Sequence, residues 1–460
     1  MITGKKIAIV GLGKEGLSSA HYFGMDNKVW LIDQKEEPEI SKDLPQSLQV
    51  NVEGCYFGSK IPDVNFDLVV RSPGIRLDNP IITKLSKNGA KITSQVKIFF
   101  DEFNGNTIGV TGTKGKGTTS TLIYEILKKA GHEVYLAGNI GVPPLDILKE
   151  LTDKSDVVLE LSSFQLMDLG KSPHITVVLM VTSDHLDWHK DSDEYQRAKE
   201  TIVKYQKPED FAVINRDYEN SMAFSKKTDA KIYFFSMKDE VNGISLKGDK
   251  IVSKIGDKTL LLDIKDIILP GRHNIQNVMA ATAVAQILNV ENETIQKVIK
   301  SFKGLKHRLQ IVDEIEGVTF VNDSISTTPE TAMAAIEAFK VPKILILGGS
   351  GKNSSFNTLA ENICRDGTIK AIVLVGQEGP KIKAAIENAG GFSGRYIEKA
   401  KSMREIVTKS FQYSTSGEII ILSPACASFD MFKNYEDRGN QFIMEVTTLK
   451  NAKSRGSAKK

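Results

Sequence analysis

Short apolar runs that end in glycine, aspartate or serine recur along the whole chain, with helical patterns between them. The runs are K-I-A-I-V-G, V-W-L-I-D, D-L-V-V-R-S-P-G, T-I-G-V-T-G, D-V-V-L-E-L-S, I-T-V-V-L-M-V, K-I-L-I-L-G-G, A-I-V-L-V-G and E-I-I-I-L-S-P. They are too apolar for the alternation of a half-exposed strand, so they predict buried parallel strands. The sequence therefore predicts an α/β protein whose functional residues follow the carboxyl ends of its strands.

The 460 residues exceed one ordinary core, and about 150 residues per domain suggests about three domains. We expect boundaries near Gln95–Phe99 and Gly304–His307, giving units 1–97, 98–304 and 305–447 and a basic, disordered tail at 448–460. The Gly-rich stretch from Phe211 to Asp266 predicts an antiparallel appendage on the middle unit.

Charge and cysteine content narrow the function classes. The chain has 60 Lys and Arg against 57 Asp and Glu, and its only cluster of like charge is the tail from Lys450 to Lys460, so nucleic-acid binding is not favoured. Three scattered cysteines without a C-x-x-C pair argue against disulfides and thiolate zinc sites. Without a signal-peptide pattern or a membrane-length apolar run, we expect a cytoplasmic protein that does not bind membranes.

The stretch V-T-G-T-K-G-K-G-T-T-S, Val110 to Ser120, predicts a phosphate-binding loop. A strand at 107–111 and a helix at 118–130 enclose Gly112, Gly115 and Lys116. Glycines allow backbone N–H groups to surround phosphate oxygens, and the lysine reaches the outer phosphates, so the motif indicates ATP. Gly117 stands where such loops usually have a hydroxyl residue for magnesium, and Thr118 and Thr119 follow it.

The first unit begins with a second glycine motif. Gly11, Gly13 and Gly16 follow a strand at 6–10, and Asp33 ends the next strand. This spacing fits a dinucleotide such as NAD, or equally the diphosphate of a UDP-sugar at a helix N-terminus. Because the chain already has a separate phosphate loop, diphosphate binding is the favoured interpretation.

Polar residues gather after two strands of the middle unit. Glu160 ends one strand and can face a magnesium ion, since hard cations bind oxygen. The next strand leads into D-H-L-D-W-H, which holds Asp184, His185, Asp187 and His189; a solvated loop is the alternative. Lys199 lies on a predicted helix downstream, where a lysine is ordinarily a surface residue.

Asn274 and Asn277 stand at positions i and i+3 near the start of a predicted helix. They share a helical face and fit the hydrogen-bonding edge of a nucleotide base. Asparagines at this position can instead cap the helix.

Taken together, the motifs of this chain resemble the Mur ligase family. The motifs are G-T-K-G-K-G-T-T, E-L-S-S-F-Q-L, D-H-L-D-W-H, E-Y-Q-R-A-K, L-P-G-R-H-N-I-Q-N, H-R-L-Q, N-D-S-I-S-T-T-P and L-S-P-A-C-A-S-F-D-M-F-K-N-Y-E-D-R-G. They occur in the family's order over nearly the whole chain, and the motifs N-D-S-I-S-T-T-P and S-P-A-C-A-S-F-D resemble those of members that add D-glutamate.

The resemblance implies an N-terminal Rossmann-like domain for a UDP-sugar, a central P-loop ATPase domain and a C-terminal Rossmann-like domain for the amino acid. It implies ATP-dependent ligation of D-glutamate to UDP-N-acetylmuramoyl-L-alanine through an acyl phosphate, a cytoplasmic step of peptidoglycan precursor synthesis. It also implies two magnesium sites, a Lys199 carbamylated by carbon dioxide, and a monomer that acts on small molecules.

The resemblance also assigns roles to individual residues. Lys116, Glu160, His185 and Lys199 would be catalytic, and the metal ligands would be Thr118, Glu160, His185 and carbamylated Lys199. ATP would contact Gly112, Thr113, Lys114, Gly115, Lys116, Gly117, Thr118, Thr119, Asn274, Asn277, Arg308 and Asp323. The UDP-sugar would contact Lys14, Glu15, Asp33, Gln34, Gly74, Asn139 and His185, and D-glutamate would contact Thr327, Lys352, Ser428 and Tyr435. The chain departs from the family pattern at Gly117, Trp188, Ile325, Ser350 and Tyr435.

Other functions compete with this one. A different Mur ligase or a folylpolyglutamate synthase would add another amino acid. A catalytically silent nucleotide-binding relative is suggested by Gly117, and an NAD oxidoreductase by the first glycine motif.

Overall fold

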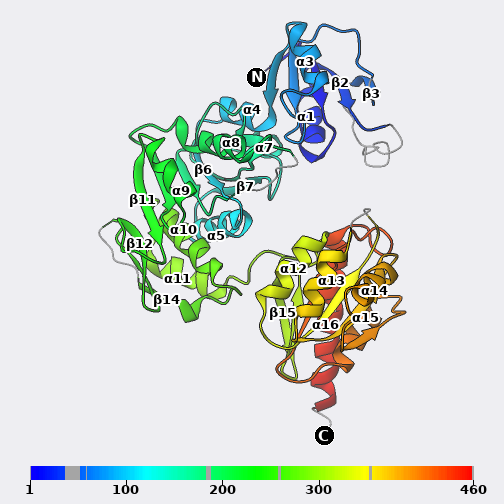
Figure 1. Cartoon of the computed structure of the whole chain (residues 1–460). Coiled ribbons are helices and arrows are strands. Elements are labelled where there is room, and N and C mark those ends of the chain that lie inside the picture. The colour runs from blue at the N-terminus through cyan, green and yellow to red at the C-terminus, as the bar shows by residue number, and fades with distance from the viewer. Residues whose placement is uncertain are drawn as a thin grey trace. The chain divides into compact units, whose positions relative to one another are not determined.

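The computed structural model describes residues 2–36, 52–58, 60–182, 188–256, 261–351 and 355–457. The chain forms two compact units, one of Met1–Ile267 with His273–Ser301 and one of Ile268–Arg272 with Phe302–Lys460. Three sheets with helices between their strands run from blue to red along the chain (Figure 1). The α/β class predicted from the apolar runs is confirmed, and all nine runs form strands that pair in parallel.

The first sheet holds five parallel strands in the order β3-β2-β1-β4-β5. Its elements are β1 (Lys6–Val10), α1 (Lys14–Gly24), β2 (Lys28–Asp33), β3 (Val52–Phe57), β4 (Leu68–Arg71), α3 (Pro80–Lys87), β5 (Lys91–Ser94) and α4 (Gln95–Glu102). Alternate residues of each strand face opposite layers. Ile7 and Ile9 pack with Phe23 and Phe99 of α1 and α4, while the residue between them, Ala8, belongs to the core on the α3 side.

The second sheet holds nine strands in the order β14-β13-β12-β11-β10-β9-β6-β8-β7. Its strands are β6 (Asn106–Thr111), β7 (Val134–Gly138), β8 (Asp156–Glu160), β9 (Ile175–Val178), β10 (Phe211–Asn215), β11 (Lys231–Ser236), β12 (Gly243–Lys247), β13 (Lys250–Ser253) and β14 (Leu261–Asp263). Its helices are α5 (Lys116–Lys129), α6 (Pro144–Ile147), α7 (Ser163–Leu166), α8 (Ser192–Lys204), α9 (Glu219–Ala223), η1 (Phe224–Lys226), η2 (Ile264–Asp266), α10 (His273–Ile287) and α11 (Asn292–Ser301). None of the helices within the described ranges is long and apolar enough to cross a membrane.

The antiparallel part of this sheet is shorter than the sequence predicted. Strands β10 and β11 pair in parallel with their neighbours and continue the main sheet, and β12 also joins β11 in parallel. Only β12–β13 and β13–β14 are antiparallel pairs. The expectation for the start of the 211–266 stretch was therefore wrong, because helix α10 packs against β10 and β11 and buries them like the other parallel strands.

The third sheet lies in the second unit and has the order β15-β16-β20-β17-β18-β19. Its elements are β15 (Gln310–Ile315), β16 (Val318–Asn322), α12 (Pro329–Ala338), β17 (Lys343–Gly348), α13 (Asn357–Arg365), β18 (Ile369–Val375), α14 (Gly379–Asn388), β19 (Arg395–Ile397), α15 (Met403–Gln412), β20 (Ile419–Leu422) and α16 (Tyr435–Ser457). Leu345 and Leu347 pack with α12, α13 and α14, whereas Ile344 and Ile346 pack with α15 and α16. All pairs are parallel except β15–β16.

The last helix, red in Figure 1, continues through most of the stretch expected to be a disordered tail. Leu449 packs on the second core of this unit, and Lys450 and Lys453 form ion pairs with Asp313 at 2.7 Å and Glu316 at 3.2 Å. These contacts account for a helix where composition alone favoured a solvated end.

The expected boundary at residues 97 and 98 falls inside helix α4. One apolar cluster includes Val96 and Phe99 of this helix together with Leu145 and Leu159 of the second sheet's layer. The first two sheets thus share a core and form one compact unit. The second expected boundary, near 304, lies close to the point where the second unit begins at Phe302.

Gly16 should be essential to the first sheet. A Cβ atom at Gly16 would lie 1.9 Å from the Gly11 carbonyl oxygen, so Gly16→Ala forces α1 away from β1. We expect a loss of about 2 to 3 kcal/mol in the free energy of unfolding, measured by urea denaturation of the full chain. Gly13→Ala is the matched control, because its φ is −72° and no atom lies within 4 Å of the added Cβ. Its loss should be about 1 kcal/mol or less, and equal losses for both variants would contradict this explanation.

Candidate active site

The glycine loop after β6 leads directly into α5, as the sequence predicted, but the helix begins two residues earlier, at Lys116. Gly112 has a φ of 156° and Gly115 a φ of 89°. A Cβ at Gly112 would lie 2.8 Å from Leu179 Cβ, and one at Gly115 would lie 2.3 Å from Asn277 Oδ1. Both backbone angle and space therefore require glycine at these positions.

The first turn of α5 presents the groups that could hold phosphate. The first N–H groups of a helix have no partner within the helix and attract anions. Lys116 Nζ donates to the carbonyl oxygens of Gly112 at 3.0 Å and Thr113 at 3.2 Å, so its ammonium lies against the loop. Thr118 is partly exposed, whereas Thr119 is fully buried and its backbone N–H donates to Gly115 O. Because the Thr119 side chain is buried, Thr118 is the better candidate for a ligand contact.

Helix α10 brings the two predicted asparagines to this loop. Asn277 Nδ2 donates to Asn274 Oδ1 at 2.7 Å, and Asn277 lies against Gly115. Both side chains are buried. His273, the first residue of the helix, has its pKa lowered by burial and by the nearby charge of Lys114. The asparagines therefore pack beside the phosphate loop and do more than cap the helix.

Glu160 lies at the carboxyl end of β8, beside the phosphate loop. Strand pairing places Val110 of β6 opposite Glu160. The carboxylate is buried, and its Oε1 accepts a hydrogen bond from Asn139 Nδ2 at 2.9 Å. The backbone N–H of Asn139 also donates to the Glu160 carbonyl. A carboxylate fixed in this way by β7 and β8 can offer its other oxygen to a cation.

Lys199 is not a surface lysine. It is 1% exposed, and its Nζ donates to Thr111 Oγ1 and to the Gly112 carbonyl, each at 3.1 Å. The same nitrogen lies 5.0 Å from the ring centroid of Tyr195, one turn earlier on α8. Tyr195 is a site residue that sequence reasoning did not single out, although its i, i+4 spacing from Lys199 in E-Y-Q-R-A-K was a readable signal.

The donor set fits a hard cation in part. Carboxylate and hydroxyl oxygens, which Mg²⁺ prefers, are available at Glu160 and Thr118. Among the described residues, no group of three or more His, Cys, Asp or Glu side chains is arranged to hold a metal ion. The segment 183–187, with Asp184, His185 and Asp187, lies outside the described residues, as does Lys352. His189, just after that segment, has its Nε2 2.9 Å from Ser163 Oγ.

Lys14, Glu15, Asp33, Gln34 and Gly74, expected to contact a UDP-sugar, lie at the first sheet, and some of them contact the second sheet's layer. Asn139 follows β7 of the second sheet. Lys14 Nζ donates to the Gly141 carbonyl at 2.8 Å, and the Gly74 carbonyl accepts a bond from Trp188 at 3.0 Å. Asp33 is buried and accepts bonds from the N–H groups of Leu12 at 2.7 Å and Lys35 at 2.9 Å. Gln34 Oε1 accepts a bond from Asn79 at 3.3 Å. Asp33 thus shapes the glycine turn itself.

Glu15 is a buried carboxyl group between the two sheets of the first unit. Its Oε1 accepts a 2.6 Å bond from Gln165 on α7, while its Oε2 is buried without a hydrogen-bond partner. Burial raises the pKa of Glu15 to about 7, although Gln165, Arg71 and Lys14 each lower it. Arg71 is itself fully buried and pairs with Asp168 at 2.6 Å.

The second unit holds the other predicted residues that the structure describes, near the carboxyl ends of β16 and β20. Asp323 Oδ1 accepts the Leu309 N–H at 3.0 Å, and its Oδ2 accepts the hydroxyls of Ser326 and Ser423. Burial raises the pKa of Asp323 to about 6. Its two oxygens thus hold the backbone next to Arg308.

Thr327 is half-buried and follows β16, and Ser428 is buried after β20. Tyr435 begins α16, where burial raises the pKa of its phenol. Arg438 was not predicted from sequence, yet it joins these loops by donating to the carbonyls of Ser324 at 2.8 Å and Cys426 at 3.1 Å. Burial lowers the pKa of Arg438 to about 10.

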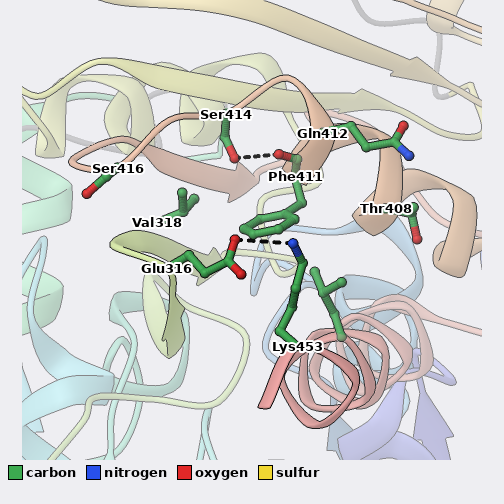
Figure 2. Close-up of a pocket in the computed structure, with 9 residues that line it drawn as sticks. Glu316, Val318, Thr408, Phe411, Gln412, Ser414, Ser416 and Lys453 are labelled. Atoms are coloured by element: carbon green, nitrogen blue, oxygen red, sulfur yellow. Dashed lines mark hydrogen bonds and ion pairs between the residues drawn. The ribbon is translucent and has the colours of Figure 1, made fainter. Parts of the chain in front are cut away.

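A separate cavity of about 410 Å³ lies at the opposite edge of the third sheet (Figure 2). The residues that line it lie near the amino ends of β16 and β20, among them Val318 and Ser416. Thr327 and Ser428 follow the carboxyl ends of these strands, so the cavity lies away from them. Glu316 and Lys453 pair across it, and Lys453 Nζ lies 5.0 Å from the Phe411 ring centroid. Its charged groups are thus already partnered, and none of the predicted site residues within the described ranges lines it.

Comparison with known proteins agrees with this arrangement. Residues 5–94 match the model for the Mur ligase MurD-like N-terminal domain, residues 110–285 the Mur ligase middle domain, and residues 307–426 the Mur ligase glutamate ligase domain. Solved structures give the same fold at low sequence identity. UDP-N-acetylmuramate-alanine ligase MurC from Thermotoga maritima has a TM-score of 0.57 at 18% identity, covering 97% of this chain and 100% of that chain. MurF ligase from the same organism, solved in complex with ADP, has a TM-score of 0.54 at 18% identity, covering 96% and 98%.

The chain therefore belongs to the Mur ligase family. It is similar along its length to proteins named UDP-N-acetylmuramoylalanine--D-glutamate ligase. The protein of that name from Acetivibrio thermocellus is 38% identical over 456 residues, covering 97% of each chain. The one from Clostridioides difficile is 38% identical over 454 residues, covering 98% of this chain and all of the relative.

The buried Glu15 predicts a pH-dependent stability. Its folded-state pKa of about 7 lies above the ordinary value of 4.5, so folding takes up a proton between these two pH values, and stability falls as the pH rises from about 4.5 to about 7. Between pH 6 and pH 8 the ligand-free chain should lose about 1 kcal/mol from this group. Glu15→Gln keeps an acceptor for Gln165 and should reduce this loss, as measured by urea unfolding across that range. Glu293→Gln on the exposed side of α11 controls for the change in net charge, and a Glu15→Gln chain with the wild-type pH dependence would contradict the prediction.

Proposed function

We propose that this chain joins D-glutamate to UDP-N-acetylmuramoyl-L-alanine at the expense of ATP, a step in making peptidoglycan precursors. The observation that carries the proposal is the meeting of the phosphate loop, Glu160 and the buried Lys199 at the carboxyl ends of β6 and β8. The full-length similarity to proteins named for that reaction supports the choice of amino acid.

The reaction has two steps that share the same site. A carboxylate oxygen of the UDP-linked alanine attacks the γ-phosphorus of ATP, and the bond from that phosphorus to ADP breaks. The amine of D-glutamate then attacks the acyl carbon, a proton leaves the nitrogen, and the carbon–oxygen bond to phosphate breaks. Lys116 and the first turn of α5 hold the phosphoryl oxygens on which negative charge gathers. Mg²⁺, when bound, would neutralise part of that charge.

Four residues would hold two magnesium ions. We assign Thr118 and Glu160 to one ion, with Thr118 replacing the hydroxyl that Gly117 lacks, and His185 to the second. Lys199 would serve as a ligand after its amine adds to carbon dioxide and loses a proton, since the resulting carbamate is anionic. An ammonium group at this buried position would repel the metal.

The remaining predicted contacts are divided between the two units of the chain. Gly112, Thr113, Lys114, Gly115, Gly117 and Thr119 would surround the phosphates, with Asn274 and Asn277 on the adenine side. Lys14, Glu15, Asp33, Gln34, Gly74 and Asn139 would line the path of the UDP-sugar. Arg308 and Asp323 of the second unit would serve the ribose and phosphates, and Thr327, Lys352, Ser428 and Tyr435 would bind D-glutamate. The chain would act as a cytoplasmic monomer on small molecules.

Phosphate release tests the reaction and its amino acid. With magnesium-ATP and UDP-N-acetylmuramoyl-L-alanine, we expect release with D-glutamate and none with L-glutamate, L-lysine or meso-diaminopimelate. Release with another amino acid would place the chain among other ligases of the family, or with folylpolyglutamate synthases if folate substrates are used. Absence of release with any acceptor would favour a silent nucleotide-binding protein.

The Lys199 carbamate predicts a chemical rescue. Lys199→Ala should lower the rate roughly 100-fold, because a metal ligand is lost. A short-chain carboxylic acid should restore part of the activity by replacing the missing carboxylate. Lys204→Ala, at an exposed position of the same helix, is the control and should keep wild-type activity. The carbamate assignment fails if no concentration of acid restores the Lys199→Ala enzyme.

A further inference from the structure

Residues of the loop after β4, Gly74 and Arg76, contact Trp188 and Glu194 near the start of α8. Trp188 Nε1 donates to the Gly74 carbonyl at 3.0 Å. The Arg76 guanidinium carbon lies 4.9 Å from the centroid of the Trp188 ring, and Arg76 also donates to the Trp188 carbonyl. Arg76, Trp188 and Glu194 are named the Arg76 cluster below.

Arg76 reaches helix α8 through two parallel bonds. Its Nη1 and Nη2 atoms donate to Glu194 Oε2 at 3.2 Å and Oε1 at 3.3 Å. The same guanidinium binds both carboxylate oxygens of Asp78, at 2.8 and 3.1 Å, within its own loop. Burial raises the pKa of Glu194, but the bonds from Arg76 and Lys190 outweigh it and lower the pKa overall, so Glu194 is ionised. Paired bonds of this kind fix orientation as well as distance.

The cluster joins two parts of the site that are far apart in sequence. Gly74 is expected on the path of the UDP-linked substrate. Glu194 lies in the first turn of α8, next to Tyr195, whose hydroxyl lies 3.0 Å from Thr113 Oγ1 in the phosphate loop. The same helix carries Lys199. A continuous set of contacts therefore runs from the substrate loop to the phosphate loop.

Trp188 is held from several sides. Its ring centroid lies 4.5 Å from that of Phe164 on α7, in a tilted arrangement. The Phe164 carbonyl accepts a 3.2 Å bond from Arg71 at the end of β4. Trp188 also follows directly after the segment that contains His185.

We propose that Arg76 and Trp188 are positioning residues for the UDP-linked substrate. They hold the Gly74 loop against α8, so that a substrate anchored on the first sheet presents its carboxylate at the phosphate loop. This inference rests on the proposed function. ATP would be held by the phosphate loop, α10 and the second unit's Arg308 and Asp323, so we expect its binding not to depend on the cluster.

The direct test compares substrate affinities in the full chain. In Trp188→Phe a smaller aromatic ring remains but the indole N–H is lost, so the dissociation constant for UDP-N-acetylmuramoyl-L-alanine should rise roughly fivefold. In Arg76→Ala it should rise roughly 30-fold, because a paired, charge-assisted contact is lost. The dissociation constant of ATP should stay within twofold in both, as measured by calorimetry. Arg365→Ala, which removes an exposed ion pair on α13, is the control and should change neither value.

The fluorescence of Trp188 on substrate binding gives a second measurement, which would not change if Arg76 and Trp188 only stabilised the fold. Trp30 and Trp188 are the only tryptophans in the sequence, and Trp30 packs in the first core beside Phe66. In a Trp30→Phe chain, adding the UDP-linked substrate should change the Trp188 emission at the concentration given by calorimetry. Adding Arg76→Ala should shift that change to the weaker dissociation constant.

The outcomes separate the inference from the proposed function. The inference is overturned if both variants bind the UDP-linked substrate like the wild type, or if ATP binding weakens equally. Reduced melting temperatures with unchanged substrate affinity would also overturn it, because they indicate stabilisation of the fold alone. If the wild type releases no phosphate but the variants still weaken substrate binding, the positioning role stands and the ligase function fails.

Discussion

Parallel pairing of β8, β6 and β9 is the constraint on which the site of the first unit depends. The register places Glu160 beside Val110 and Thr111 beside Val178, so the carboxyl ends of these strands meet at one edge. The Thr113 N–H then bonds the Met180 carbonyl at 2.7 Å, which fixes the start of the phosphate loop. If one strand slipped by a single residue, its side chains would move to the opposite face of the sheet, and Glu160 would no longer lie beside the phosphate loop.

The burial of Lys199 shows how packing and chemistry are linked. An ammonium group removed from water requires compensation, which Thr111 Oγ1, the Gly112 carbonyl and the Tyr195 ring supply. A hydrophobic residue would fill this space at lower cost. The retention of a lysine beside the phosphate loop is therefore better explained by function than by stability, which agrees with its proposed role as a metal ligand after carbamylation.

The first two sheets form one compact unit because they share a hydrophobic core. Helix α4 contributes to a core that includes residues of both layers, and the buried Arg71–Asp168 pair lies where they meet. The second unit has two cores of its own, on either side of its sheet. In the proposed function, the first unit would hold the UDP-linked acid and most of the ATP contacts, and the second would bring the amino acid.

The sequence by itself determined the strands, the phosphate loop and the family, because buried parallel strands and glycine turns depend on local patterns of residues. It also singled out Glu160 from its place at the end of a strand, whereas Lys199 was singled out through motif resemblance, because a lysine on a helix carries no local sign of burial. Arg76 and Arg438 were missed because each acts on residues distant in the chain. Tyr195 was missed although its spacing from Lys199 is local, and its contact with Thr113 in the phosphate loop joins residues far apart in the sequence. The parallel course of β10 and β11 and the helical tail were likewise decided by tertiary packing, through α10 in one case and ion pairs to Asp313 and Glu316 in the other. Local patterns specify elements, whereas contacts between distant residues decide which polar groups are buried together.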